Sequence, residues 1–383
     1  MLSSNDSQLV SQPPHFIWKF PQIQGNPPQS RYGHSAIRYQ NSMIIFAGED
    51  NETNKTLNDV HILNLESWTW EKPQVSGEIP PSRSFHTAVL NKEQMVVWGG
   101  YFEQIPGGYI CNDTDVYILE LKTWHWSRVI PNGTPPVARS HHSAALFKDK
   151  LFIYGGYRDI YFSYDNLHLL DLTTMSWLKL EAKSSIGSAS SGLVVRDNTL
   201  IKFFGDGAYE GFCSDILTLN LTDLDFTNLL GLQWQKAELA PTIENYSGKT
   251  ILSLSNSDED EDYEDEDYED IDYFFYPGRT VGGYGEFGNN LVIFSGVAAQ
   301  DGLSHATIDN LLLLNLPVTG SVTNGIYRAI IPQADGNFPT PRHGHSTIQF
   351  NNQMIIFGGF RFDPPDGINN YDNNTYILEM QNI

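Results

Sequence analysis

The sequence has little cysteine, few basic residues and no long hydrophobic run. Cys111 and Cys213 are the only cysteines in 383 residues, which excludes a disulfide framework and a zinc site built on cysteines. Lys and Arg number 23 against 46 Asp and Glu, so the formal net charge is −23. This charge disfavours binding to nucleic acid or to an anionic membrane, because both need clustered basic side chains. No segment approaches the roughly 18 apolar residues of a membrane-spanning helix.

The N-terminal segment also lacks a targeting signal. Its sequence, MLSSNDSQLVSQPPHF, contains neither a basic n-region nor an apolar core. We therefore expect a cytoplasmic protein in which residues 1–15 form a flexible tail. The aromatic content of 13% and the 32 glycines indicate a compact β protein that is rich in turns.

What the sequence does contain is a repeat. Four segments share the pattern Arg-x-x-His-[Ser/Thr], followed by a short polar turn and an apolar run that predicts a strand buried on both faces. They are RYGHSAIRYQNSMIIFAG from Arg31, RSFHTAVLNKEQMVVWGG from Arg83, RSHHSAALFKDKLFIYGG from Arg139 and RHGHSTIQFNNQMIIFGG from Arg342. Degenerate copies occupy roughly residues 188–239 and 282–332. Tryptophans recur at intervals of 51 to 57 residues, at Trp70, Trp126, Trp177 and Trp234.

The two ends of the chain complete one repeat between them. The last copy ends at Ile383 without a Trp-bearing run, and such a run occurs near the start of the chain, around Trp18. There, WKFPQIQGNPPQSRYGHS aligns without a gap with WEKPQVSGEIPPSRSFHT. We therefore predict a circularly closed array of six blades in which the N-terminal strand completes the last blade. Closure removes the exposed edge of an open array.

These motifs resemble those of the kelch-repeat β-propellers, whose period is about 50 residues. The resemblance covers roughly residues 16–383, with two copies that depart from the pattern and with Tyr327 in the place of a Trp. It implies an all-β, six-bladed kelch propeller. The layout without an appended module looks like free-standing kelch proteins, some of which are small-GTPase or cytoskeletal effectors.

The histidines of the repeat allow two readings. His34, His86, His142 and His345 occupy one position in four copies, and four imidazoles could satisfy zinc. However, equivalent residues on adjacent sheets lie roughly 10 Å apart, whereas zinc needs nitrogen ligands at about 2.1 Å. We therefore expect partly buried histidines bonded to the backbone, and no metal.

The arginines of the repeat also allow two readings. One is structural, with each guanidinium tying blade to blade through carboxylates or carbonyls. The other is a ring of basic side chains at one mouth of the central channel, able to grip an acidic ligand. The residues concerned are Arg31, Arg83, Arg139, Arg279 and Arg342.

The loops between the second and third strands are long and aromatic, whereas the turns between the first and second strands are short. Strand alternation places the long loops and the links between blades on one face. Because binding usually concentrates in such loops on a rigid scaffold, we expect a partner protein to bind there. Alternatively, the aromatic side chains pack against their own loops. The candidates are Tyr101, Tyr157, Arg158, Tyr209, Phe360 and Arg361.

An acidic insertion interrupts the repeat. Residues 258–272 hold 12 acidic side chains, and such a block repels itself. We expect residues 255–275 to be disordered and dispensable for folding. The segment is either a surface insertion without a partner, or it recruits a basic partner or covers the channel mouth.

Two classes of function are open. The first is a non-catalytic interaction scaffold or adaptor, which we favour, with a protein partner, no cofactor and a monomeric propeller. The second is a small-molecule enzyme, because the kelch resemblance extends to sugar mutarotases, copper radical oxidases and iron-dependent specifier proteins. Against the enzyme reading, the chain shows no P-loop, nucleophile elbow or HExxH motif.

Overall fold

The computed structural model describes most of the repeat, in fourteen separate ranges. The described residues are 14–105, 108–159, 162–183, 187–207, 211–222, 232–240, 242–245, 250–253, 280–281, 283–299, 305–307, 311–316, 326–361 and 373–381. Most of the expected tail, the acidic insertion 255–275, Tyr209 and Arg279 lie outside them. Among the described residues there is no helix of the length and hydropathy that a bilayer-spanning segment needs.

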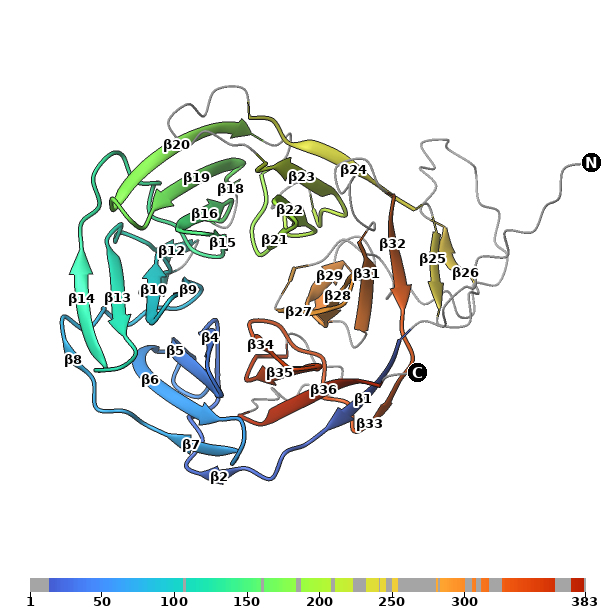
Figure 1. Cartoon of the computed structure of the whole chain (residues 1–383), viewed down its shortest axis with the longest axis horizontal. Helices are drawn as coiled ribbons and strands as arrows, with labels where there is room; N and C mark the ends of the chain where they lie inside the picture. Colours follow the sequence, from blue (N-terminus) through green and yellow to red (C-terminus); the bar gives the residue numbers. More distant parts are fainter. Residues whose placement is uncertain are drawn as a thin grey trace, which may run out of the picture.

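Antiparallel sheets stand side by side around a central channel, so the molecule is an all-β propeller (Figure 1). Each of the first three sheets runs outward from the channel in chain order. Their main strands are β4 (Ser35–Tyr39), β5 (Ser42–Asp50), β6 (Thr56–Asn64) and β7 (Thr69–Glu71); β9 (Thr87–Asn91), β10 (Gln94–Trp98), β13 (Val116–Glu120) and β14 (His125–Val129); and β15 (Ser143–Phe147), β16 (Lys150–Tyr154), β19 (Asn166–Asp171) and β20 (Ser176–Lys183). The short β3 (Arg31–Tyr32) also pairs with β5.

The degenerate copies form a larger, ten-stranded sheet. Two antiparallel runs meet in it through a parallel pairing of their outer strands, Glu238 with Ile326 and Leu239 with Tyr327. Its strands are β21 (Gly192–Arg196), β22 (Thr199–Phe203), β23 (Ile216–Asn220), β24 (Gln235–Leu239), β25 (Thr242–Asn245), β26 (Thr250–Ser253), β27 (Tyr284–Phe287), β28 (Asn290–Phe294), β31 (Leu311–Asn315) and β32 (Ile326–Ile331).

The ends of the chain meet in one sheet, as the alignment of Trp18 predicts. β1 (His15–Lys19) pairs antiparallel with β36 (Thr375–Gln381), with Trp18 opposite Leu378. β34 (Ser346–Phe350) and β35 (Gln353–Phe357) complete the inner part of this sheet. The N-terminal strand is therefore its outer antiparallel strand.

The outer edge of the Trp-bearing strands is covered by the chain that arrives from the preceding sheet. β2 (Gln24–Gly25), β8 (Ser76–Gly77) and β33 (Ala334–Gly336) pair parallel with β7, β14 and β1. Gly77 has a φ of 83°, and a Cβ there would come within 2.1 Å of the Trp126 carbonyl oxygen. Glycine is therefore required for this close approach, which shields an exposed sheet edge.

The core lies between adjacent sheets. The second strand of each sheet is buried on both faces, and Met95 to Trp98 of β10 are all inaccessible to solvent, which confirms the expectation from the apolar runs. Aromatic rings interlock across the sheets. Trp98 packs edge-to-face on Trp177 at 5.4 Å between ring centroids, and Phe46 lies 4.9 Å from Trp126.

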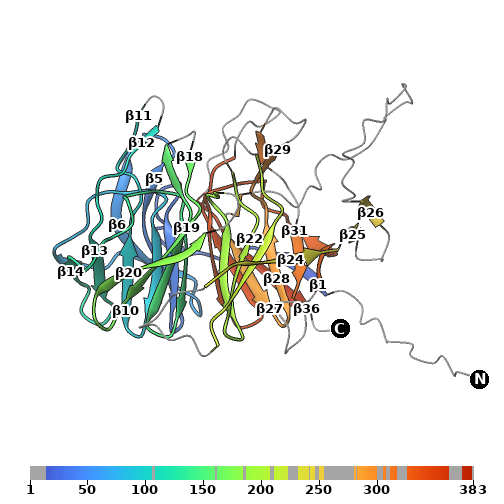
Figure 2. The ribbon, with the colours of Figure 1, turned by 90° about the horizontal axis from the view of Figure 1, so that it is seen from above.

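The two faces of the propeller differ (Figure 2). On one face project the hairpins formed by β11 (Glu103–Ile105) with β12 (Gly108–Ile110), β17 (Tyr157–Asp159) with β18 (Phe162–Ser163), and β29 (Val297–Ala299) with β30 (His305–Thr307). The opposite ends of the sheets carry tight turns such as those at Gln40 and Lys148. The long loops therefore share one face, which we call the loop face.

Candidate functional site

Five backbone hydrogen bonds link six equivalent positions around the channel at the loop face. The third residue of the Arg-x-x-His pattern donates its N–H to the carbonyl of the equivalent residue in the preceding sheet. The bonds join Gly33 to Gly344, Phe85 to Gly33, His141 to Phe85, Ser190 to His141 and Val281 to Ser190, at 2.7 to 3.0 Å. Phe85 and His141 adopt positive φ values of 50° and 56°. In this left-handed conformation, the N–H and C=O groups of both residues bond to the equivalent residues of the two neighbouring sheets.

The histidines of the repeat join neighbouring sheets. His86 Nε2 hydrogen bonds with the hydroxyl of Ser35 at 2.8 Å, and His142 Nε2 with that of Thr87 at 2.9 Å. His34 Nε2 makes the same bond with Ser346 across the junction between the last and first repeats. The Ser or Thr that follows His in the motif is thus the acceptor or donor for the next sheet.

These histidines are buried and uncharged. Burial lowers the pKa of His142 to about 3 and that of His345 to about 3, and holds the pKa values of His34 and His86 well below their usual range. The described residues contain no cluster of His, Cys, Asp or Glu that could hold a metal ion. The hydroxyl partners show that the expected backbone bonding is incomplete as a description, because the Nε2 atoms of His34, His86 and His142 bond to side chains of the adjacent sheet.

The four motif arginines that the structure describes do not form a basic ring at the channel mouth. Arg31, Arg83, Arg139 and Arg342 are each at most 1% exposed, and their guanidinium groups turn into their own sheets. Each Nη1 donates to the carbonyl found 16 residues later, that of Ala47, Gly99, Gly155 and Gly358, at 2.8 to 3.1 Å. This burial and these bonds within one sheet support the structural reading of the four arginines, and binding of a partner by them stays a prediction.

The same arginines tie the sheets together through their backbone and not through their side chains. Gly100 N–H donates to the Arg139 carbonyl at 3.0 Å, and Gly359 N–H donates to that of Arg31 at 2.9 Å. A Cβ at Gly100, where φ is 92°, would meet the Ser84 carbonyl at 2.8 Å. Ser84 belongs to the same sheet. A Cβ at Gly99, where φ is 70°, would lie 2.9 Å from the Arg139 carbonyl oxygen of the next sheet, so the first glycine of the pair permits the contact between blades.

We expect Arg83→Ala to cost about 3 kcal/mol of unfolding free energy or more, because it leaves a buried carboxylate and carbonyl without a donor. Arg83 is fully buried and pairs with Asp113 at 2.9 Å. Arg128→Ala, which removes a half-exposed pair with Asp115, is the matched control and should cost under about 1 kcal/mol. Urea unfolding measures both. Equal costs would contradict the structural role of Arg83.

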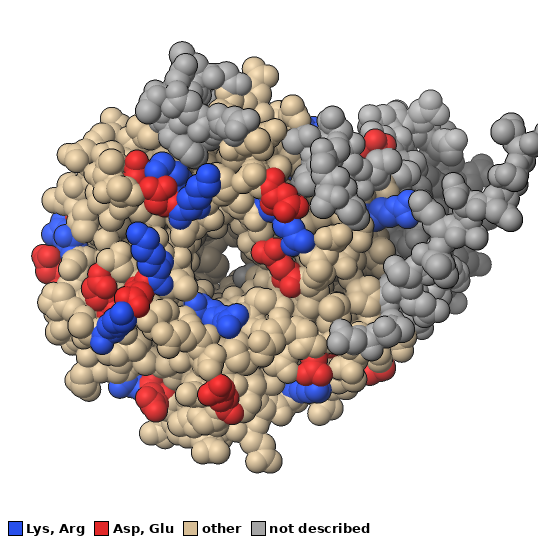
Figure 3. All heavy atoms as spheres, in the orientation of Figure 1, with Lys and Arg blue, Asp and Glu red and all other residues tan. Residues whose placement is uncertain are grey.

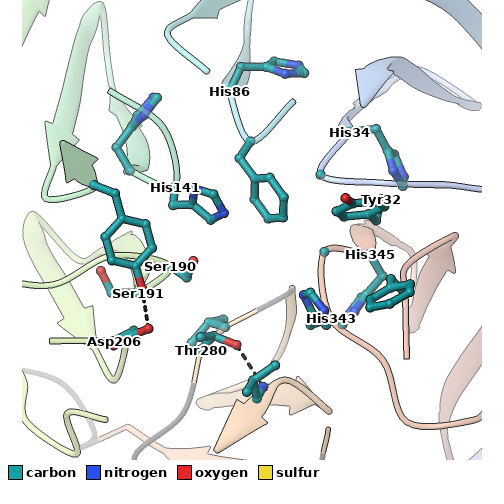
Figure 4. A pocket seen from close by; sticks show the side chains of 18 of the residues that line it. Tyr32, His34, His86, His141, Ser190, Ser191, Asp206, Thr280, His343 and His345 are labelled. Atoms are coloured by element: carbon teal, nitrogen blue, oxygen red, sulfur yellow. Dashed lines mark hydrogen bonds between the residues drawn. The ribbon is translucent and has the colours of Figure 1, made fainter. Parts of the chain in front are cut away.

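A cavity of about 510 Å³ lies on the channel axis inside this ring (Figure 4). Residues from two recurring positions of the repeat form most of its walls. One is the pair of residues after the motif Arg, and the other is the residue directly after the last glycine that follows the second strand. These positions are adjacent, as the bridges Ser84–Tyr101 and His343–Phe360 show. The lining includes Tyr32, Phe85, Tyr101, His141, Tyr157, Ser190, Ser191, Asp206, Phe212, Thr280, Val281, Val297, His343 and Phe360. Figure 3 shows the opening at the centre of the ring.

Part of the wall is a continuous aromatic surface. Phe85 stacks on His141 with 3.7 Å between ring centroids, and Tyr101 lies parallel to Phe85 at 6.0 Å. Tyr32 contacts Phe85 at 5.8 Å and Phe360 at 5.6 Å. Along the rest of the ring, Ser190, Ser191, Asp206 and Thr280 place hydroxyl and carboxylate groups (Figure 4).

Carboxylates hold the tyrosines of this wall. The buried Glu49 accepts hydrogen bonds from the hydroxyls of Tyr32 and Tyr101, both at 2.6 Å. The hydroxyl of Tyr157 donates to Asp206. Burial lowers the pKa of His141 to about 3 and that of His343 to about 4, so both are neutral near pH 7. The described lining therefore contains negative charge and no Lys or Arg.

Comparison with known proteins identifies the repeat. The KLHDC2/KLHL20/DRC7 Kelch-repeats domain family matches residues 4–192 and 105–238, which together make up more than half of the chain. The chain belongs to the kelch-repeat family. A solved structure described as "Structure of YjhT" superposes with a TM-score of 0.61 over 93% of this chain and 99% of its own, at 14% identity. That likeness concerns the fold alone.

Curated relatives are similar over part of the chain. Acyl-CoA-binding domain-containing protein 5 of Arabidopsis thaliana is 26% identical over 59% of this chain and 37% of its own length. Human Kelch domain-containing protein 3 is 26% identical over 55% of each chain. Rho GTPase-activating protein gacHH of Dictyostelium discoideum is 32% identical over 35% of this chain and 9% of its own length. The kelch chain thus spans between about a third and a half of the first two relatives.

The structure brings together only some of the candidates. Tyr101, Tyr157 and Phe360 line the cavity, although Tyr101 is 1% exposed. Arg361 is half-buried and is absent from the lining, and Arg158 lies in β17 with its side chain outside the described part. The sequence reasoning missed Tyr32, Phe85, His141, Asp206 and His343. The signal that could have found them was their position in the repeat. They are variable residues that stand next to the fixed residues of the kelch motif.

Proposed function

We propose that this kelch propeller is a non-catalytic scaffold that binds a protein partner at the axial cavity and the surrounding loop face. The aromatic wall of the cavity carries the proposal, because aromatic side chains held rigidly around a concavity are the usual anchors of interface energy. Tyr32, Phe85 and Phe360 lie on separate sheets and are fixed by contacts with one another. The kelch relatives are consistent with an interaction role.

The ionisable groups of the cavity do not favour general acid–base catalysis. That chemistry is most efficient with a pKa near the working pH. The pKa values of His141 and His343 are instead lowered, by burial, to about 3 and about 4. The alternative remains a small-molecule enzyme of the mutarotase, oxidase or specifier type, and the size of the cavity, about 510 Å³, favours it.

The double variant Tyr157→Ala/Phe360→Ala should reduce partner recovery at least tenfold, since truncation of two aromatic anchors costs about 2 kcal/mol or more. Proximity labelling or affinity capture from cells, followed by mass spectrometry, measures this. The matched control is Asn41→Ala/Lys148→Ala, which alters exposed side chains in the tight turns of the opposite face. Loss of the partner in the turn variant, with retention in the loop-face variant, would show that the partner binds the other face.

We further infer that the propeller has six blades. The six positions linked by the backbone ring, from Gly344 to Val281, support this blade count. We also infer a cytoplasmic monomer. An effector role in small-GTPase or cytoskeletal pathways is a finer version of the proposal, supported by the relative named a Rho GTPase-activating protein.

A further inference from the structure

We infer that the axial cavity takes a cationic side chain of the partner, the ammonium of a lysine or the guanidinium of an arginine in a basic segment. This rests on the proposed function, since it names the chemistry that the same cavity recognises. It also gives the ligand a positive charge, whereas the arginine motif had suggested an acidic ligand. The argument uses the ring faces, the carboxylates and the absence of cations in the described lining.

Aromatic side chains from several sheets line one volume. Tyr32, Phe85, Tyr157 and Phe360 all line the cavity, and their neighbours fix them at centroid distances of 5.1 to 5.8 Å. A cation above the face of such a ring is attracted by the ring quadrupole, by about 2 kcal/mol where water is excluded. The fold already uses this attraction, because Arg342 lies 4.7 Å from the ring of Tyr376.

The carboxylates strengthen the preference for a positive ligand. Glu49 is 2% exposed and lies behind the wall, where it accepts from the hydroxyls of Tyr32 and Tyr101. A phenol that donates to a carboxylate becomes more electron-rich, since hydrogen-bonded groups polarise one another. Asp206 lines the cavity directly and accepts from Tyr157. The Asp206 carboxylate therefore lines the space that the ligand side chain enters, and the Glu49 carboxylate lies behind its wall.

An acidic ligand would find no compensating charge in the described lining. The arginines that could have supplied it are buried and turned into their own sheets. His141 and His343 are neutral, because burial holds their pKa values at about 3 and about 4. Moving a carboxylate out of water without a cationic partner carries a large desolvation cost. The net charge of −23 also raises the association rate of a basic segment by electrostatic steering.

The test uses four fluorescein-labelled pentapeptides, Gly-Gly-X-Gly-Gly with blocked ends, in which X is arginine, lysine, citrulline or glutamate. Fluorescence anisotropy with the full chain should give arginine and lysine affinities about tenfold above those of citrulline and glutamate. Citrulline keeps the shape of arginine without its charge. Glu49→Gln and Asp206→Asn keep the hydrogen-bond acceptors for the tyrosines, and each should weaken the arginine peptide about fivefold.

Glu93→Gln is the matched control, because Glu93 lies in a tight turn away from the cavity and pairs with Lys122. It changes the net charge equally and should leave arginine binding unchanged. Tighter binding of the glutamate peptide, equal binding of citrulline and arginine, or no binding of any peptide would each overturn the inference. The proposed function survives those results if Tyr157→Ala/Phe360→Ala still loses the cellular partner, and it fails separately if that variant keeps it.

Discussion

Deletion of residues 1–22 is expected to destabilise the propeller by about 6 kcal/mol or more. It removes β1, and with it the antiparallel partner of β36 from Ile377 to Gln381. It also removes Phe16 and Trp18, which are 0% and 3% exposed and pack on Phe287 and Phe294. Loss of one buried Phe or Trp side chain typically costs about 3–5 kcal/mol. Urea unfolding of the deletion variant against the full chain measures the loss.

Two further variants separate closure from mere shortening of the chain. Deletion of residues 1–13 stops before β1 and should leave the unfolding free energy unchanged. Trp18→Ala keeps the strand and should lose roughly 3–5 kcal/mol, which is part of the full effect. The longer deletion should also associate, because it exposes the edge of β36. If the variant without residues 1–22 melts within a degree or two of the full chain, β1 contributes nothing to closure.

The closure was predictable because it depends on repeated, buried residues. Trp18 aligns with Trp70 and Trp126 without a gap, and all three are buried at the same place in their sheets. The continuous apolar runs likewise predicted the second strands. Residues packed on both faces leave a pattern that any copy of the repeat must satisfy. The order of strands and the meeting of the chain ends follow from that pattern.

The cavity could not be predicted in the same way. Its lining residues, such as Phe85, His141 and Ser190, are the variable positions of the repeat, and they share a location without sharing chemistry. The choice between the two readings of the arginines depends on side-chain direction for a related reason. Arg83 precedes β9, the strand next to the channel, but its side chain turns back to the Gly99 carbonyl and Asp113. The repeat pattern predicts where the backbone of Arg83 lies. The direction of its side chain depends on hydrogen-bond partners 16 and 30 residues later in the chain.

Acidification from about pH 7 to about pH 5 is expected to cost several kcal/mol of unfolding free energy, since each buried histidine with a strongly lowered pKa contributes up to about 2 kcal/mol. These histidines are His34, His86, His142 and His345, each at most 6% exposed. Burial lowers the pKa of His142 to about 3 and that of His345 to about 3, and lowers those of the other two as well. The unfolded chain binds these protons below about pH 6.5, whereas the folded chain stays neutral down to a much lower pH.

The stability from these groups is therefore fully present above about pH 6.5 and is lost as the pH falls toward about 3. Because a domain has only about 5–15 kcal/mol in total, a loss of several kcal/mol is a large part of its stability. Urea unfolding at about pH 7.5, 6 and 5 gives the slope, which reports the number of protons taken up on unfolding. His142→Gln should lower that number by about one, whatever its effect on stability at neutral pH. If the unfolding free energy stays constant between about pH 7 and 5, the histidines take up protons equally in the folded and unfolded chain. The folded protein would then hold them charged at about pH 5, which contradicts buried, neutral imidazoles bonded to Ser35, Thr87 and Ser346.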